Sequence, residues 1–316
     1  MTADPVFPPE TDAASFQAFI LLCDDKDLLN RPKSIETSDR CDGLSDYPTL
    51  MRFLIARKND PDAAVNQLQQ SLNFREDRDI LPLYEVVDTE DFEQARQFCA
   101  GWSVSKCETG ASPKPDMLQM ASVFHDSLVR FVLPLCNMMN DRSNSSTPVS
   151  SSIYLVDASG LGLKQGWNLK SFAQEISWLL STCYPETILK VFVCNAPSYF
   201  ATVWKYLKKW VDPNTAEKIE VLGSHEVSDA LKENIDAADI PTTFGGDFDF
   251  DHGSLPVLDG SIRDRLSWNS PQESLPSGPL KFSEGADGKL MAMAVGGSRR
   301  LKRNEVIATI DLDGGE

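Results

Sequence analysis

The segment from Pro197 to Val211 limits the possible folds of this chain more than any other stretch. Its aromatic and aliphatic residues cover more than half the circumference of about four helical turns. Lys205, Lys208 and Lys209 supply the polar remainder. A helix with so wide an apolar face has to cover a large cavity or contact a membrane.

The flanking sequence predicts an α/β fold around this helix. Ile153 to Val156 is a short β-branched run, and Ile188 to Cys194 is almost continuously apolar, as in a strand covered on both faces. Between them, one helical face is formed at intervals of three and four residues by Leu169, Phe172, Ile176, Leu179 and Cys183. A strand, a helix and a second strand in this order predict a right-handed parallel crossover. Lys218 to Leu222 predicts a third strand, and Ile240 to Gly246 a terminating turn.

The sequence before this region is mainly helical in pattern. We expect a short helix over 16–22 and a helical hairpin over 47–74, broken at Asn59-Asp60-Pro61 because proline suits a helix start. A further helix is possible over 91–99, a short strand over 101–106, and a long helix over 117–139 that Pro134 kinks or ends. Arg57 and Lys58 end the first helix of the hairpin, where cations complement the helix dipole.

These patterns divide the chain into four predicted parts. Residues 1–44 form a partly disordered N-terminal extension, and 45–116 a helical subdomain with a connector. Residues 117–250 form an α/β domain, and 251–316 a C-terminal extension. Within that extension, 290–295 and 304–312 could be edge strands.

Charge and cysteine content exclude several classes of protein. The formal charge of −17 over 316 residues repels nucleic acid, so no nucleic-acid partner is expected. No window resembles a membrane span, and the first residues lack the features of a signal peptide. The seven cysteines include no C-x-x-C pair and are interpreted as reduced, mostly buried thiols. We therefore expect a cytoplasmic protein.

Motifs for catalysis, cofactors and metals are weak. Gly160, Gly162 and Gly166 follow a strand, but their spacing departs from that of a dinucleotide-binding turn. No G-x-S-x-G is present, and the three histidines (His125, His225 and His252) have no acid and nucleophile nearby in sequence. The acidic run at 247–251 lacks the glycine and glutamate positions of a calcium loop, and its alternation with phenylalanine favours an edge strand. No cofactor and no metal are expected.

One basic cluster stands out on this acidic chain. It spans 299–303 and contains three arginines and a lysine around Leu301. A solvated turn and a contact with anionic lipid are both consistent with it.

A set of short motifs, in order and in register, resembles the CRAL-TRIO family. The branch that the chain resembles is that of the yeast-type phosphatidylinositol/phosphatidylcholine transfer proteins. The match covers roughly 45–80 and 150–250, and its motifs are Tyr184-Pro185-Glu186, Asn195-Ala196-Pro197, Trp204, Asp212-Pro213-x-Thr215, Lys218-Ile219, Leu222-Gly223, Ile240-Pro241 and Phe244-Gly245-Gly246. The resemblance implies a helical N-terminal subdomain, followed by a mixed, largely parallel sheet flanked by helices that enclose a lipid pocket.

The resemblance also implies specific site residues. The family's phosphatidylinositol headgroup site falls on Arg57, Lys58, Glu186, Thr215 and Lys218, which favours phosphate contact over helix capping for the first two. The family's movable gate helix falls on 197–211, with Tyr199, Phe200, Val203, Trp204, Leu207 and Trp210 as gate residues. Two features depart from the pattern. An Asp-Gly-Arg-Pro motif is missing between 95 and 120, and of two strand positions associated with phosphatidylcholine, Ser152 matches whereas Tyr154 does not.

The sequence therefore predicts a lipid-binding and transfer protein, not an enzyme. Its expected ligand is a phospholipid, with phosphatidylinositol favoured, and its expected membrane contact is transient. A monomer is expected. The alternatives are a carrier or sensor of another apolar ligand (a sterol, a tocopherol-like molecule or haem), a lipid-sensing scaffold, and a nucleotide-dependent enzyme that uses the Gly160 turn.

Overall fold

The N-terminal part of the molecule is a compact group of helices with its own core. The computed structural model describes residues 11–98, 115–139, 147–161, 163–298 and 301–310. α1 (Ala13–Asp25), α2 (Tyr47–Ala56) and α3 (Pro61–Asp77) bury one shared apolar cluster around Phe19, Phe53 and Leu68. The predicted hairpin is confirmed, and the predicted helix over 16–22 is confirmed as part of the longer α1.

Aspartates start both helices of the hairpin. The Asp46 carboxylate accepts a hydrogen bond from the Thr49 N–H (3.0 Å), and the Asp60 carboxylate accepts one from the Ala63 N–H (3.1 Å). Each aspartate precedes a proline at the start of its helix, where the missing N–H costs nothing. The starts of α2 and α3 are therefore set locally, and Arg57, the C-cap of α2, lies at the hairpin tip.

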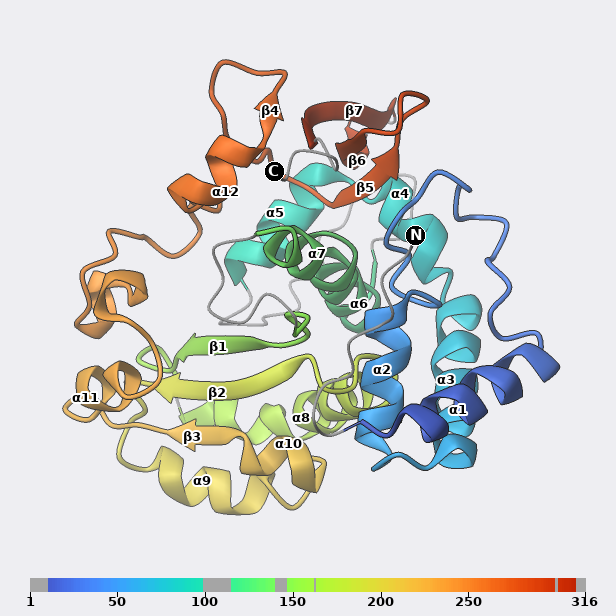
Figure 1. Cartoon of the computed structure of the whole chain (residues 1–316). Helices are drawn as coiled ribbons and strands as arrows, with labels where there is room; N and C mark the ends of the chain where they lie inside the picture. The colour runs from blue at the N-terminus through green and yellow to red at the C-terminus, as the bar shows by residue number, and fades with distance from the viewer. Residues whose placement is uncertain (1–10, 99–114, 140–146, 162, 299–300, 311–316) are drawn as a thin grey trace.

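A second group of helices lies between the two sheets (Figure 1). It contains α4 (Ile80–Val86), α5 (Thr89–Phe98), α6 (Met117–Ser127), a π-helical turn η1 (Leu128–Val132) and α7 (Leu133–Asn137). The long helix predicted over 117–139 is confirmed, and the π-turn ends two residues before Pro134. A wider turn is a known way for a helix to accommodate the missing N–H and the bulky ring of proline. The strand predicted over 101–106 lies outside the described residues.

The parallel sheet has the order β1-β2-β3, with β1 (Ser152–Asp157), β2 (Ile188–Cys194) and β3 (Ile219–Val221). β1 pairs in parallel with β2, and β2 with β3, so a parallel connection from β1 to β2 through α8 (Leu163–Cys183) is confirmed. The connections after β2 are α9 (Phe200–Leu207) and α10 (Pro213–Glu217), and after β3 come α11 (Val227–Lys232), η2 (Ala237–Asp239) and η3 (Thr242–Phe244).

The apolar helix is shorter than predicted. We expected a helix over 197–211, but α9 begins at Phe200 and ends at Leu207. The N–H groups of Lys209 and Trp210 bond to carbonyls three residues back, which tightens and ends the last turn. The chain then straightens before Pro213, as the residue preceding a proline requires.

The terminating turn after η3 requires glycine at both positions. Gly245 has a φ of +85°, and a Cβ on Gly246 would lie 2.1 Å from the carbonyl oxygen of Ile240. The expectation of an edge strand over 247–251 was wrong. Phe248 makes only an isolated bridge to Pro241, and its ring stacks on Phe250 at 5.6 Å. Among the described residues, no strand pairs with the segment around Asp249.

The C-terminal segment forms a second, antiparallel sheet. After α12 (Gly260–Arg265), the strands β4 (Ser267–Trp268), β5 (Leu280–Glu284), β6 (Leu290–Ser298) and β7 (Leu301–Ile310) are arranged in the order β4-β7-β6-β5. The prediction of edge strands at 290–295 and 304–312 was wrong, because β6 and β7 are the two inner strands. Both strands are apolar on the face that packs against α7 and η1, and an inner position satisfies their backbone groups on both sides.

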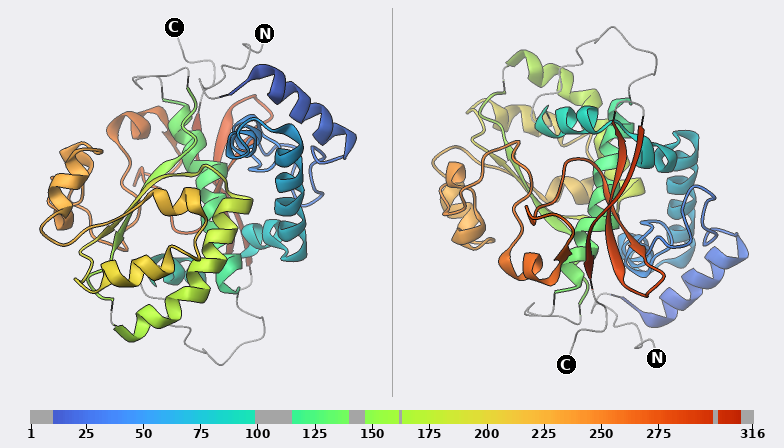
Figure 2. Two further views of the ribbon diagram at one scale, coloured as in Figure 1. Left: turned by 90° about the horizontal axis from the view of Figure 1, so that it is seen from below. Right: turned by 90° about the horizontal axis from the view of Figure 1, so that it is seen from above.

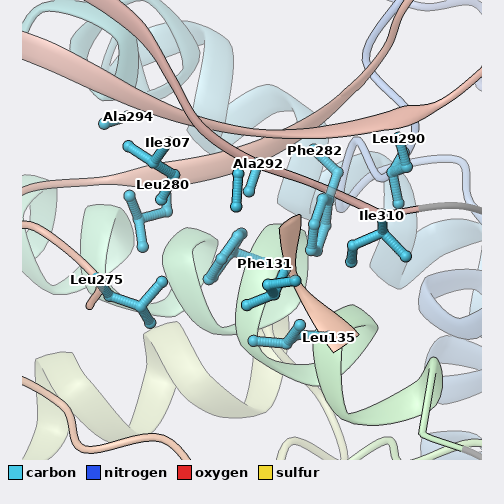
Figure 3. Close-up of a cluster of buried hydrophobic side chains, with 12 residues drawn as sticks. Phe131, Leu135, Leu275, Leu280, Phe282, Leu290, Ala292, Ala294, Ile307 and Ile310 are labelled. Atoms are coloured by element: carbon cyan, nitrogen blue, oxygen red, sulfur yellow. The ribbon is translucent and has the colours of Figure 1, made fainter. Parts of the chain in front are cut away.

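The antiparallel sheet and the π-turn share one core (Figure 3). Phe131 of η1 stacks on Phe282 of β5 with ring centroids 4.7 Å apart. Beside this core lie four buried charged residues that are joined by ion pairs of 3.0–3.5 Å: Asp39, Glu85, Arg130 and Lys281. They come from the N-terminal segment, α4, η1 and β5. The second sheet is therefore bound by apolar and ionic contacts to elements far away in the chain.

No helix in the described ranges is long and apolar enough to cross a membrane. Five cysteines are described, all as free thiols, and Cys23, Cys183 and Cys194 are buried. Burial raises the pKa of the Cys183 and Cys194 thiols to about 11.

Candidate functional site

A small polar cavity lies at the amino-terminal ends of β2 and β3. Its walls come from the end of α2, from the middle of α3, from the end of α8 with the turn after it, and from α10 with the residue that follows. Its volume is about 80 Å³. The lining residues are Ala56, Arg57, Gln67, Leu180, Ser181, Tyr184, Pro185, Glu186, Ile188, Asp212, Asn214, Thr215 and Lys218.

Four of the five predicted headgroup residues meet in this cavity. Arg57 comes from the helical hairpin, whereas Glu186, Thr215 and Lys218 come from turns of the parallel-sheet domain. Lys58, the fifth, does not line the cavity. Its φ is +53° and its side chain is exposed, because the chain reverses at this residue to enter α3.

Of the two cationic side chains that line the cavity, only Lys218 has an acidic partner among the described residues. Lys218 Nζ donates hydrogen bonds to Glu186 Oε2 (2.8 Å) and to the carbonyl oxygen of Ile188 (2.8 Å). Both side chains of this ion pair are about a quarter exposed, at 26% and 30%. Arg57 is exposed and has no ion-pair partner in the described part of the chain. The cavity therefore has one internally neutralised cation and one cation available to an anion.

Glu186 is held in an unusual backbone conformation. Its φ is +55°, which is uncommon for any residue with a side chain. The turn is closed by Thr187, whose hydroxyl donates to the carbonyl oxygen of Tyr184 (2.7 Å). This turn directs the chain from the end of α8 into β2 and brings Glu186 to Lys218.

Thr215 is positioned by an N-cap. Asp212 caps α10 by accepting hydrogen bonds from the Thr215 N–H (3.1 Å) and hydroxyl (3.3 Å). The N–H of Asp212 in turn donates to Ser177 Oγ on α8 (2.7 Å). The Asp-Pro-x-Thr pattern thus has a local structural role in addition to placing the threonine at the cavity.

A buried network fixes the two halves of the cavity relative to each other. Arg75 of α3 makes two parallel hydrogen bonds to Asp126 of α6, at 2.7 and 3.0 Å, with both side chains almost fully buried. The Tyr184 hydroxyl lies 2.8 Å from the same carboxylate, and the Arg75 guanidinium lies over the Tyr184 ring. Burial raises the pKa of the Tyr184 hydroxyl well above its usual range. The tyrosine therefore stays a neutral donor beside Asp126.

Sequence reasoning missed two kinds of residue in this cavity. Asp212 and Asn214 are polar wall residues that the motif pattern left as part of a turn. Gln67 lies three residues after the buried Ala64, on the apolar face of α3, where a polar residue is unusual. That break in an otherwise apolar pattern was the available signal.

The predicted gate residues lie away from the cavity. Phe200 and Leu207 are buried, whereas Trp210 is exposed, and so is the neighbouring Tyr206 on α9. The Tyr199 hydroxyl donates to the carbonyl oxygen of Leu161, and Lys170 Nζ of α8 lies 3.7 Å from the centre of the Trp210 ring. α9 thus has a buried edge and an exposed aromatic edge. Figure 2 shows it alongside α8.

The parallel sheet, its covering helices and the cavity at the strand ends define an α/β domain preceded by a helical subdomain. Residues 102–246 match the model of the CRAL/TRIO domain, and SEC14 cytosolic factors are among the proteins similar to the chain. The domain begins upstream of β1 and ends at the Gly245-Gly246 turn.

Several curated proteins are similar to the chain. A SEC14 cytosolic factor of Candida glabrata is 32% identical over 44% of this chain and 45% of its own length. A SEC14 cytosolic factor of Eremothecium gossypii is 26% identical over 75% of this chain and 81% of its own. The phosphatidylinositol/phosphatidylcholine transfer protein SFH4 of Arabidopsis thaliana is 29% identical over 64% of this chain and 36% of its own length. The chain thus spans less than half the length of several relatives.

A crystal structure of Sfh5 aligns with 70% of this chain and 84% of its own, at a TM-score of 0.47 and 16% identity.

Proposed function

We propose that this protein binds a phospholipid, with phosphatidylinositol as its ligand, and exchanges it between membranes. The observation that carries the proposal is the convergence of Arg57, Glu186, Thr215 and Lys218 on one cavity from separate elements. The names of similar proteins support it, because SFH4 of Arabidopsis thaliana is called a phosphatidylinositol/phosphatidylcholine transfer protein.

The chemistry of the cavity suits a phosphorylated polyol. Arg57 and Lys218 supply cations for a phosphodiester, and charge-assisted hydrogen bonds to phosphate are among the strongest in proteins. Glu186 and Thr215 supply acceptors for ring hydroxyls. Choline has no hydrogen-bond donor, so these acceptors favour an inositol headgroup over choline.

The cavity must widen when the ligand enters. Its volume of about 80 Å³ is well below the roughly 300–1,000 Å³ typical of ligand pockets. In the proposed cycle the Lys218 ammonium moves from the Glu186 carboxylate to the phosphate, which frees that carboxylate to accept hydroxyl hydrogen bonds. No covalent bond is made or broken.

The acyl chains require complete enclosure. Each methylene exposed to water costs about 0.8 kcal/mol, so two acyl chains would cost on the order of 20 kcal/mol. We propose that the segment over 197–211 opens at the bilayer, where Trp210 enters the interface and the lysines at 205, 208 and 209 meet anionic headgroups. We propose a cytosolic monomer that contacts membranes transiently.

The identity of the bound lipid tests this proposal directly. Native mass spectrometry of the purified full chain, after incubation with vesicles of mixed phospholipids, should show one phosphatidylinositol per protein. Transfer of that lipid between donor and acceptor vesicles should follow. A bound sterol, tocopherol-like molecule or haem would replace the ligand assignment, and binding without transfer would make the protein a lipid sensor.

A further inference from the structure

Gln67 is a buried amide in the wall of the cavity, and neither its residue type nor its position follows from the headgroup motifs. It lies on α3 and is only 2% exposed. Its Nε2 donates to the carbonyl oxygens of Ser181 (2.8 Å) and Thr182 (3.2 Å) at the end of α8. These two contacts join the helical subdomain to the parallel-sheet domain.

The two contacts also determine which way the amide faces. Both partners are carbonyl oxygens, which can only accept hydrogen bonds, so the NH₂ group must face them. The amide oxygen is therefore directed away from α8. Gln67 Oε1 is buried and has no hydrogen-bond partner among the described residues. A buried acceptor without a donor is unfavourable, and a donor that reaches it is favoured.

The surroundings of Gln67 make this acceptor rigid. The bidentate Arg75–Asp126 pair lies two turns further along α3 and holds that helix to α6, and the Tyr184 hydroxyl joins the same carboxylate. Arg75, Asp126 and Tyr184 are all almost fully buried. An acceptor on a helix held in this way keeps its position, which is what discrimination between similar headgroups requires.

We propose that Gln67 is a specificity-determining residue of this cavity, whose Oε1 accepts a hydrogen bond from a hydroxyl of a phosphorylated polyol headgroup. Together with the Glu186 carboxylate, it offers acceptors on two sides of the cavity, from α3 and from the turn before β2. A headgroup without hydroxyl donors leaves Oε1 unsatisfied. The inference rests on the proposed function and adds the residue that selects the headgroup.

The test compares Gln67→Met with Gln70→Met in the full chain. Met keeps the length of the side chain and removes both polar atoms of the amide. Gln70 is the control position because it is exposed on the same helix. Each protein is incubated with vesicles of equimolar phosphatidylinositol and phosphatidylcholine, and the bound lipids are counted by native mass spectrometry. Gln67→Met should lower the ratio of bound phosphatidylinositol to phosphatidylcholine about fivefold, as expected for one lost hydrogen bond. Gln70→Met should leave it unchanged.

The outcomes separate this inference from the proposed function. If Gln67→Met lowers the loading of both lipids equally, or leaves the ratio unchanged, Gln67 is only a structural link between α3 and α8 and the inference is wrong. If the unaltered protein loads neither lipid, the proposed function itself fails. Gln67→Asn serves as the second variant, because it keeps an amide but withdraws the oxygen by one methylene. It should lower the ratio in the same direction even if Gln67→Met does not fold.

Discussion

Lys218 Nζ lies 2.8 Å from Glu186 Oε2, although the two residues are 32 positions apart in the chain. The parallel pairing of β2 with β3 makes this possible, because the residues preceding the two strands meet at one edge of the sheet. The two charges of this pair neutralise each other, whereas Arg57 remains without an ion-pair partner in the described part of the chain. The same two groups are the ones that the proposed function assigns to the phosphate and to the ring hydroxyls.

Replacing Lys218 with Met should reduce phosphatidylinositol transfer at least tenfold. The lost interaction is a charge-assisted hydrogen bond, worth about 1.5–3 kcal/mol. The fold should persist, because the pair is partly exposed. Vesicle transfer assays with circular dichroism measure both effects. Lys190→Met is the matched control, since Lys190 makes a similar pair with Glu220 (2.7 Å) outside the cavity. Equal transfer by the two variants would contradict the headgroup assignment.

Replacing Asp126 with Asn should lower the free energy of unfolding by about 3–5 kcal/mol, because the buried Arg75 charge loses its counterion. Urea denaturation measures the change. Arg78→Ala is the control. Its ion pair with Asp116 is equally short, at 2.6 Å, but both side chains are about half exposed. That variant should lose less than about 1 kcal/mol. A similar loss in both variants would show that burial does not decide the strength of these pairs.

Replacing Lys281 with Met should lower the free energy of unfolding by about 3–5 kcal/mol. Asp39 and Glu85 would then share Arg130 as their one buried cation. Lys232→Met, on the exposed surface of α11, should change the unfolding free energy by no more than about 0.5 kcal/mol. Urea denaturation distinguishes the two. An unchanged midpoint for Lys281→Met would mean that the C-terminal sheet is not energetically coupled to the N-terminal segment.

Replacing Tyr206 with Ser should slow lipid transfer several-fold without changing the amount of lipid already bound. Tyr206 is 65% exposed on α9, and an aromatic side chain at that position favours the membrane interface. Val257→Ser, at a similarly exposed apolar residue (62%) in the loop before α12, is the control. Stopped-flow transfer and vesicle sedimentation provide the two readouts. Loss of bound lipid in solution would instead assign Tyr206 to the ligand.

The stability of the protein should fall as the pH drops below about 6.5, in part because of His125. Burial lowers the pKa of this imidazole in the folded state, against an ordinary value of about 6.5 in the unfolded chain. The unfolded state therefore binds a proton that the folded state does not, and acid favours unfolding by at most about 1.4 kcal/mol per pH unit from this group.

Urea titrations at pH 7.5 and 5.5 test this pH dependence. His125→Phe should show a smaller loss of stability than the unaltered protein over the same range. His252→Phe, at an exposed residue, should behave like the unaltered protein. If His125→Phe retains the full pH dependence, the acid sensitivity comes from other groups.

The sequence by itself determined the local elements and showed the resemblance to the CRAL-TRIO family. Apolar periodicity predicted α2, α3 and α6, the strands β1 and β2, and the parallel crossover between them, because these depend on neighbours within a few turns or one strand. The aspartate–proline starts of α2, α3 and α10 are also local. The family resemblance identified four residues that the structure brings to one cavity: Glu186 and Thr215 through the Tyr-Pro-Glu and Asp-Pro-x-Thr motifs, Lys218 through Lys218-Ile219, and Arg57 through the match over 45–80.

Only the tertiary structure decided which residues meet. Lys281 and Asp39 are 242 positions apart, and no periodicity relates them. The same is true of Gln67 and the end of α8, and of the inner position of β6 between β5 and β7. The tertiary structure also excluded Lys58 from the cavity, because one left-handed residue turns its side chain to the surface. The local sequence pattern predicts the type and position of each helix or strand. Burial and pairing between residues far apart in the chain arise only when these elements pack together.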